Sequence, residues 1–158
     1  MAPSERTDAR IRDATEADLP RLVELLAQLS LDDAPRERLG HPLPESYRAA
    51  LQQIEADPRQ RQLVIEARGR VVGTASLIII PNLSHRGRPW AVIENVVVDE
   101  PERGSGYGEL LLRYAVEEAR RAGCYKLSLT SNKQRKGAHL FYQRLGFRAT
   151  HEGFRVDF

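Results

Sequence analysis

Apolar and polar positions recur with two different periods along the chain, and the changes of period divide it into strands and helices. Residues 9–13 alternate and predict a short strand. The apolar residues between 19 and 29 recur at helical spacing behind Thr15, whose hydroxyl is suited to cap a helix. A second, weaker helix is predicted over 45–56, because Pro58 disfavours helical backbone at the residue before it.

The middle of the chain is rich in β-branched residues and predicts three strands. Residues 62–67 and 71–80 form apolar runs on either side of the turn Arg68-Gly69-Arg70, which is the pattern of a hairpin. The stretch 81–89 is predicted to be a loop. It leads into a third long strand, WAVIENVVV, over residues 90–98.

The period becomes helical again from Glu109, and Gly123 ends that helix. On it, Glu117 and Arg121 stand one turn apart and are predicted to form an ion pair. The further predicted elements are a strand over 125–130, a helix over 137–145, and closing strands over 147–150 and 154–158. This order predicts a single α+β domain over residues 1–158, with a mixed, mostly antiparallel sheet of about six or seven strands flanked by about four helices.

Composition narrows the class of protein. Of the 158 residues, 41% are apolar and 29% are charged, a mixture typical of one soluble globular domain. The longest apolar run, 77–80, is far shorter than the roughly 20 residues that span a bilayer, so no membrane partner is expected. Cys124 is the only cysteine and the four histidines lack metal-ligand spacing, so neither an internal disulfide nor a metal site is expected. Together with the polar N-terminus, these features predict a cytoplasmic protein.

Charge argues against a nucleic-acid partner. The formal net charge is +2, and three of the 24 Lys and Arg residues are lysines. The sequence has no run of five or six like charges, and aromatic residues do not interleave with its densest basic stretch, 133–136. A solvated surface of mixed charge is the simpler interpretation.

The segment Arg103-Gly104-Ser105-Gly106-Tyr107-Gly108 lies between an apolar strand and a helix. Glycines at alternate positions let successive backbone N–H groups converge at a helix N-terminus, an arrangement that binds phosphate. The segment lacks the Lys of a Walker loop and the G-x-G-x-x-G spacing of a dinucleotide fold. The spacing R-G-x-G-x-G fits a loop around the pyrophosphate of coenzyme A, and from spacing alone a merely tight turn is an equal alternative.

Three linked segments, IENVVVDEPERGSGYGELLL, YKLSLTSN and AHLFYQRLGF, resemble the GCN5-related N-acetyltransferase (GNAT) superfamily in order and spacing. Residues 93–129 are similar to glucosamine-phosphate acetyltransferases, and residues 130–154 to aminoalkylphosphonate acetyltransferases. The resemblance implies transfer of acetyl from acetyl-CoA to a primary amine of a small molecule, by direct attack in a ternary complex. It also implies a homodimer, for which the closing segment 154–158 offers an edge strand.

Two residues are the candidates for proton transfer. The resemblance implies that Tyr142, in the segment FYQRLGF, donates a proton to the departing thiolate, although a packed core tyrosine is the alternative. Glu94 is the candidate base, because a carboxylate among valines is costly unless it is paired, hydrated or functional. Pairing with one of the arginines is equally open. The alternation predicts one strand face shared by Val92, Glu94, Val96 and Val98.

The resemblance also implies the residues that hold the cofactor. Backbone groups of the strand over 90–98 would contact the pantetheine arm. The glycine-rich segment would bind the pyrophosphate, and a polar side chain after the next strand would contact the cofactor. His85 and Arg86, in the loop before the strand, are candidates for binding an acidic group of the acceptor. The predicted cofactor-binding residues are Val96, Val97, Val98, Arg103, Gly104, Ser105, Gly106, Tyr107, Gly108 and Asn132.

Three other functions stay open at this point. A protein N-terminal or lysine acetyltransferase would need an open acidic groove, against which the arginine-rich loops argue. A non-catalytic acyl-CoA sensor would keep the glycine-rich segment without needing Tyr142 or Glu94. A transferase acting on aminoacyl-tRNA would need a continuous basic face.

Overall fold

The computed structural model describes residues 8–30, 37 and 40–158. Residues 1–128 and 129–158 form two compact units, each described by itself. The first unit carries the whole of the sheet. Because the chain divides into these two units, the single domain over residues 1–158 stays a prediction.

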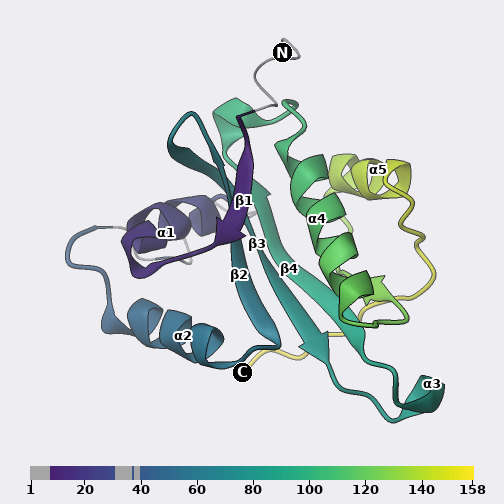
Figure 1. The fold of residues 1–158 in the computed structure, drawn as a ribbon. Coiled ribbons are helices and arrows are strands. Elements are labelled where there is room, and N and C mark those ends of the chain that lie inside the picture. The colour runs from purple at the N-terminus through teal and green to yellow at the C-terminus, as the bar shows by residue number, and fades with distance from the viewer. Residues whose placement is uncertain (1–7, 31–36, 38–39) are drawn as a thin grey trace. The chain divides into compact units, whose positions relative to one another are not determined.

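The first unit is built on a five-stranded sheet of order β1-β2-β3-β4-β5 (Figure 1). The first three pairings are antiparallel and the last is parallel, so the predicted mixed, mostly antiparallel sheet is confirmed. The predicted count of six or seven strands is wrong for the described residues, where five form. Their bounds are β1 Arg10–Asp13, β2 Gln60–Ala67, β3 Arg70–Ile80, β4 Trp90–Val98 and β5 Leu127–Ser128.

Five α-helices occur in the described chain, against about four predicted. The additional one is the short α3, which lies inside the predicted loop 81–89. Thr15 lies at the predicted cap and forms a capping box with Asp18, in which the Thr15 backbone N–H donates to the Asp18 carboxylate at 2.8 Å. The helices are α1 Leu19–Ala27, α2 Glu45–Ala56, α3 Ser84–Gly87, α4 Tyr107–Arg121 and α5 Lys136–Arg144, with 3₁₀ turns η2 Glu16–Asp18 and η3 Glu100–Glu102.

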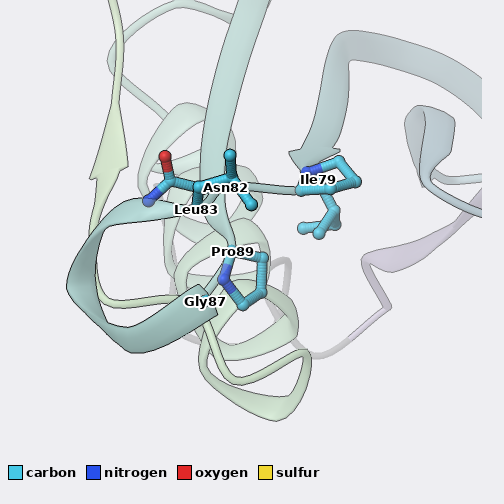
Figure 2. Close-up of a pocket in the computed structure, with 6 residues that line it drawn as sticks. Ile79, Asn82, Leu83, Gly87 and Pro89 are labelled. Carbon is cyan, nitrogen blue, oxygen red and sulfur yellow. The ribbon is translucent and has the colours of Figure 1, made fainter.

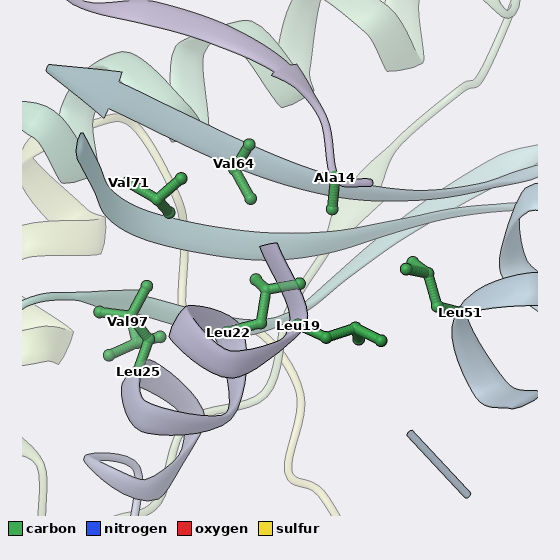
Figure 3. Close-up of a cluster of buried hydrophobic side chains, with 8 residues drawn as sticks. All are labelled: Ala14, Leu19, Leu22, Leu25, Leu51, Val64, Val71 and Val97. Carbon is green, nitrogen blue, oxygen red and sulfur yellow. The ribbon is translucent and has the colours of Figure 1, made fainter. Parts of the chain in front are cut away.

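Helices α1 and α2 cover one face of the sheet, whereas α4 packs against β3 and β4 (Figure 1). On the face toward α1 and α2, strand side chains meet the apolar stripe of α1 (Figure 3). Leu25 is fully buried, and truncating such a leucine to alanine costs about 2–5 kcal/mol. The cluster consists of Ala14, Leu19, Leu22, Leu25, Leu51, Val64, Val71 and Val97.

A β-bulge interrupts β4 at its centre. Ser76 of β3 lies opposite Glu94, but Thr74 lies opposite Val97, so β4 contains one residue more than β3 over this stretch. Asn95 absorbs the extra length with a left-handed backbone at φ 54°. Glu94 and Val97 therefore share a face of the sheet.

The bulge overturns the predicted common face of Val92, Glu94, Val96 and Val98. Val98 lies opposite Gly73, on the other face from Glu94, because simple alternation fails across an inserted residue. The two strands approach closely here. A Cβ on Gly73 would lie 2.9 Å from the Val97 carbonyl oxygen.

Three local predictions fail for identifiable reasons. Arg121 pairs with Glu118 and Glu117 pairs with Arg120, both at i,i+3 spacing, in place of the predicted Glu117–Arg121 pair. The predicted strand 125–130 is reduced to β5, which pairs with β4 at two positions only. The segments 147–150 and 154–158 form no strand in the described unit, because alternation alone supplies no hydrogen-bonding partner.

Candidate functional site

The glycine-rich segment forms a turn between the end of β4 and the start of α4. Gly104 and Gly106 take φ values of 82° and 87°, a left-handed region that side chains with a Cβ rarely adopt. Two hydrogen bonds close the turn: the Arg103 amide donates to the Glu100 carbonyl at 3.2 Å, and the Ser105 amide to the Glu102 carbonyl at 3.3 Å. The turn therefore uses the amides of Arg103 and Ser105 internally.

Four other amides of the turn are available to a ligand. Within the described chain, the N–H groups of Gly104, Gly106, Tyr107 and Gly108 donate to no backbone carbonyl. They lie at the N-terminus of the 15-residue helix α4, where the peptide dipoles favour an anion. Tyr107 as a whole residue is 1% exposed, so its ring packs in the core and is not expected to contact a ligand. The arrangement suits a phosphate group.

Asp99, directly before this turn, is 4% exposed and is held by three side chains. Arg21 of α1 donates to Oδ2 through a very short contact, Arg70 of β3 donates to the same oxygen at 3.0 Å, and Gln28 donates to Oδ1 at 2.8 Å. Burial alone would raise the pKa of Asp99, but the hydrogen bonds from Gln28 and Arg21 and the nearby positive charges outweigh it and lower the pKa. Asp99 is thus an ionised anchor.

Arg103 is exposed but fixed at two points of its guanidinium. Its Nε donates to the Val98 carbonyl at 3.1 Å, and its Nη2 donates to Gln28 Oε1 at 3.3 Å. A guanidinium has five N–H donors, so three are left for a ligand once these two bonds to described residues are made. Gln28 lies 75 positions away in the sequence and follows no motif, which is why the sequence analysis missed it.

The edge of β4 beside β5 is open over much of its length. Within the first unit, β5 pairs with β4 only at Ala91 and Val92, and no strand of this unit follows on that side from Ile93 to Val98. Free strand N–H and C=O groups are the usual partners of an extended ligand that adds to a sheet edge. Val96 and Val98, which were predicted to offer backbone groups, lie on this stretch.

Glu94 is half-buried at the centre of β4, beside a row of polar side chains. Ser76, directly opposite, donates to Gln62 Oε1 at 2.8 Å, and Gln62 Nε2 donates to the Thr74 hydroxyl at 2.7 Å. Asn95 at the bulge reaches Ser76 Oγ at 3.4 Å. Glu94 therefore lies next to a row of hydrogen-bonded polar side chains rather than among apolar ones only.

His85 and Arg86 both lie in α3, at the end of β4 away from the glycine-rich turn. Both have left-handed backbones, with φ of 53° and 61°. The His85 ring stacks on Tyr125 at a centroid distance of 3.7 Å, and Arg86 is exposed. The adjoining loop forms a shallow depression (Figure 2), lined by Ile79, Pro81, Asn82, Leu83, Gly87 and Pro89.

The second unit carries Tyr142 and Asn132. Tyr142, on α5, contacts Phe141 and Phe147, with ring centroids 5.5 and 6.0 Å away. The Asn132 Oδ1 accepts from the Gln134 amide at 2.9 Å and so fixes the turn before α5, while its Nδ2 is not used by that turn. Gly146 ends α5 with φ of 90°, as predicted.

The first unit therefore brings together Glu94, the open edge of β4, Arg103 and the four amides. No helix in the described ranges is long and apolar enough to cross a membrane. Among the same residues, no group of three or more His, Cys, Asp or Glu is arranged to hold a metal ion.

Comparison with known proteins agrees with the geometry of the turn. Residues 23–147 match the model of the acetyltransferase (GNAT) family. The chain is 36% identical over 156 residues to the glucosamine 6-phosphate N-acetyltransferase of Trypanosoma brucei brucei, covering 95% of this chain and 96% of that protein. It is 31% identical over 145 residues to the aminoalkylphosphonate N-acetyltransferase of Salmonella typhimurium, covering 91% and 88%.

Among solved structures, a protein of Bacillus halodurans C-125 described as a transcriptional regulator superposes with a TM-score of 0.88. The two are 38% identical, and the match covers 95% of this chain and 99% of the other.

Proposed function

The chain belongs to the acetyltransferase (GNAT) family and is an acetyl-CoA-dependent N-acetyltransferase, and we propose that it acetylates the primary amine of a small acidic molecule. The amine would attack the thioester directly while both substrates are bound. The observation that carries the proposal is the set of four open amides and Arg103 beside the open edge of β4.

Acetyl-CoA supplies the activated acyl group, and the chain's own residues hold it. The amides of Gly104, Gly106, Tyr107 and Gly108 are placed to bind the pyrophosphate, together with the guanidinium of Arg103. The predicted contacts of Ser105 and Asn132 belong to the same proposal. Backbone groups of Val96, Val97 and Val98 would bind the pantetheine arm as a further strand would.

The amine must lose a proton before it attacks. An alkylamine of pKa about 10.4 is neutral in roughly one molecule per thousand at pH 7, a penalty of about 4 kcal/mol. Glu94 is the proposed base, acting directly or through a water, because it lies half-buried at mid-strand beside Ser76 and Gln62. Such a residue contributes about 10²–10⁴-fold in rate.

The leaving thiolate needs a proton, and Tyr142 is the proposed donor. Support comes from the match to the family over residues 23–147, which includes the FYQRLGF segment. The Tyr142 phenol would donate its O–H proton to the sulfur as the C–S bond breaks, and the phenolate would then be reprotonated from water.

The acceptor is proposed to carry a phosphate or phosphonate. The two relatives named above are described as acting on glucosamine 6-phosphate and on aminoalkylphosphonates, which are both amines with such a group. His85 and Arg86 are the side chains proposed to bind it, since both are exposed and beside β4. A cytoplasmic homodimer is proposed as the working form.

One experiment tests the proposal in two stages. Calorimetry with coenzyme A comes first, and we expect a single site. Turnover is then followed by release of the free thiol with glucosamine 6-phosphate, 2-aminoethylphosphonate, glucosamine and a peptide with free amino groups. We expect the two phosphorus-containing amines to react fastest. E94Q and Y142F should each lose about 10²-fold or more in kcat, while Y114F, which alters a half-buried tyrosine of α4 that contacts Arg61, should not.

Absence of coenzyme A binding would remove the donor assignment. A peptide that reacts faster than every small amine would replace the small-molecule acceptor. Full activity of Y142F across the pH range would remove the proton-donor role.

A further inference from the structure

We propose that Gln28 is a positioning residue for the donor's pyrophosphate, because its side-chain amide fixes residues 99–103 and with them the direction of Arg103. The inference rests on the proposed function and adds to it a residue outside the glycine-rich turn. It is carried by three hydrogen bonds from one side chain.

The amide of Gln28 uses both of its ends on the same short segment. Its Nε2 donates to Asp99 Oδ1 at 2.8 Å, and its Oε1 accepts from the Glu100 backbone N–H at 3.0 Å and from Arg103 Nη2 at 3.3 Å. Reversing the amide would set its oxygen against the Asp99 carboxylate and its NH₂ group against two donors. The partners therefore admit one orientation.

Gln28 is itself held on a rigid base. It caps the C-terminus of α1, where its own backbone N–H donates to the Leu25 carbonyl at 3.0 Å, and Leu25 is fully buried. Its partner Asp99 is anchored by Arg21 and Arg70. Because Gln28 and Asp99 are both held in place, the hydrogen bonds of the Gln28 amide fix the position of residues 99–103.

Arg103 is the group that gains from this arrangement. Its side chain is exposed, and a free arginine samples many rotamers. Without Gln28 its guanidinium would keep one hydrogen bond to the described part of the chain, the one to the Val98 carbonyl. Holding a cation in its binding geometry before the anion arrives lowers the cost of binding. We expect Gln28 to act on donor affinity, and only through the pyrophosphate.

The test uses Q28M, which keeps the size and helix preference of the side chain and removes all three hydrogen bonds. By calorimetry, coenzyme A should bind Q28M about tenfold more weakly than the unaltered chain. With S-acetylpantetheine, which lacks the pyrophosphate, kcat/KM should be unchanged. Q52M is the matched control, since it makes the same substitution at an exposed glutamine of α2, and it should alter neither quantity.

A double-mutant cycle identifies the route. If Gln28 acts through Arg103, the loss of coenzyme A affinity in Q28M/R103A will be smaller than the product of the two single losses. Equal losses with both donors would show a general structural role and overturn the inference, as would a coenzyme A affinity unchanged in Q28M. If Q28M does not fold, Q28A is taken through the same comparison. Failure of the unaltered chain to bind coenzyme A would overturn the proposed function as well.

Discussion

The two ends of β4 are built differently. At the Val98 end, Asp99 is buried, ionised and tied to α1 and β3 by Arg21, Arg70 and Gln28. At the Trp90 end, the polar side chains are exposed and rest on aromatic rings: His85 stacks on Tyr125, and Lys126 lies 4.6 Å from the centre of the Trp90 ring. The ends lie about 26 Å apart, at roughly 3.3 Å per strand residue.

The difference follows from what each end is proposed to bind. A donor that is the same in every turnover is best met by groups that do not move, and a buried ionic anchor supplies them. An acceptor that varies between relatives is better met by exposed side chains on a loop, where substitutions cost little stability. The bulge at Asn95 separates the two ends and lies next to Glu94.

The largest expected effect is at the Val98 end of β4, called the fixed end because Asp99 is anchored there. D99N keeps the shape of the side chain but turns an NH₂ group toward the donors of Arg21 and Arg70. Since Asp99 is almost fully buried, we expect a loss of about 3 kcal/mol in the free energy of unfolding, and a coenzyme A affinity that falls with it. Urea unfolding measures the first quantity as a shift of midpoint at constant slope.

D157N is the control for that variant, because Asp157 also bonds an arginine, Arg155, but the two side chains are 75% and 73% exposed. Its unfolding midpoint should stay unchanged. A D99N midpoint equal to that of the unaltered chain would mean that the Val98 end is no more rigid than the Trp90 end, and the contrast would fail.

The second-largest expected effect is the loss of stability at the fixed end when the pH is lowered. The pKa of Asp99 is lowered, since its hydrogen bonds and positive neighbours outweigh burial, and that of Asp18 is lowered chiefly by its hydrogen bond from Arg12. Each group therefore adds stability that is complete above the ordinary carboxyl pKa of 3.8 and is lost as the pH falls through the lower folded-state pKa. Unfolding measured from pH 6 to pH 2 should show a shallower acid decline for D99N. An identical decline in both proteins would contradict the lowered pKa of Asp99.

At the Trp90 end of β4, called the exposed end, substitutions should change acceptor binding without changing the stability of the fold. H85N/R86N removes the ring and the charge while keeping asparagine, which tolerates the left-handed backbone at both positions. We expect KM for an amine bearing phosphate to rise about tenfold, with the affinity for coenzyme A and the unfolding midpoint unchanged. R113Q, on the exposed face of α4, is the matched loss of charge. A change in coenzyme A affinity would show that the ends are coupled.

The contrast between the ends also explains what the sequence could predict. β4 matches its predicted range of 90–98 and α2 its predicted range of 45–56, because apolar periodicity reports burial directly. The glycine-rich turn is equally readable, since Gly104 and Gly106 take the left-handed backbone that glycine permits.

What the sequence could not predict depends on contacts between distant residues. Gln28 meets Asp99 and Glu100 across more than 70 positions, and a glutamine at the end of a helix carries no pattern. The bulge at Asn95 has no glycine to announce it. The alternation over 154–158 does predict a strand, yet Phe154 and Phe158 are exposed in the described unit, because a strand also needs an edge to pair with.

The smallest expected effect concerns Lys126, whose ammonium lies over Trp90 and 5.6 Å from the Tyr125 ring centre. Exposed cation–π contacts are worth about 0.5–1 kcal/mol, so K126M should lower the free energy of unfolding by no more than this while keeping the bulk of the side chain. Differential scanning calorimetry resolves such a change as a shift of a few degrees or less. K133M, in the second unit, provides the comparison for loss of a lysine charge alone. A K126M loss as large as that of D99N would place a structural anchor at the Trp90 end too, and the assignment of a fixed donor end and an adaptable acceptor end would have to be abandoned.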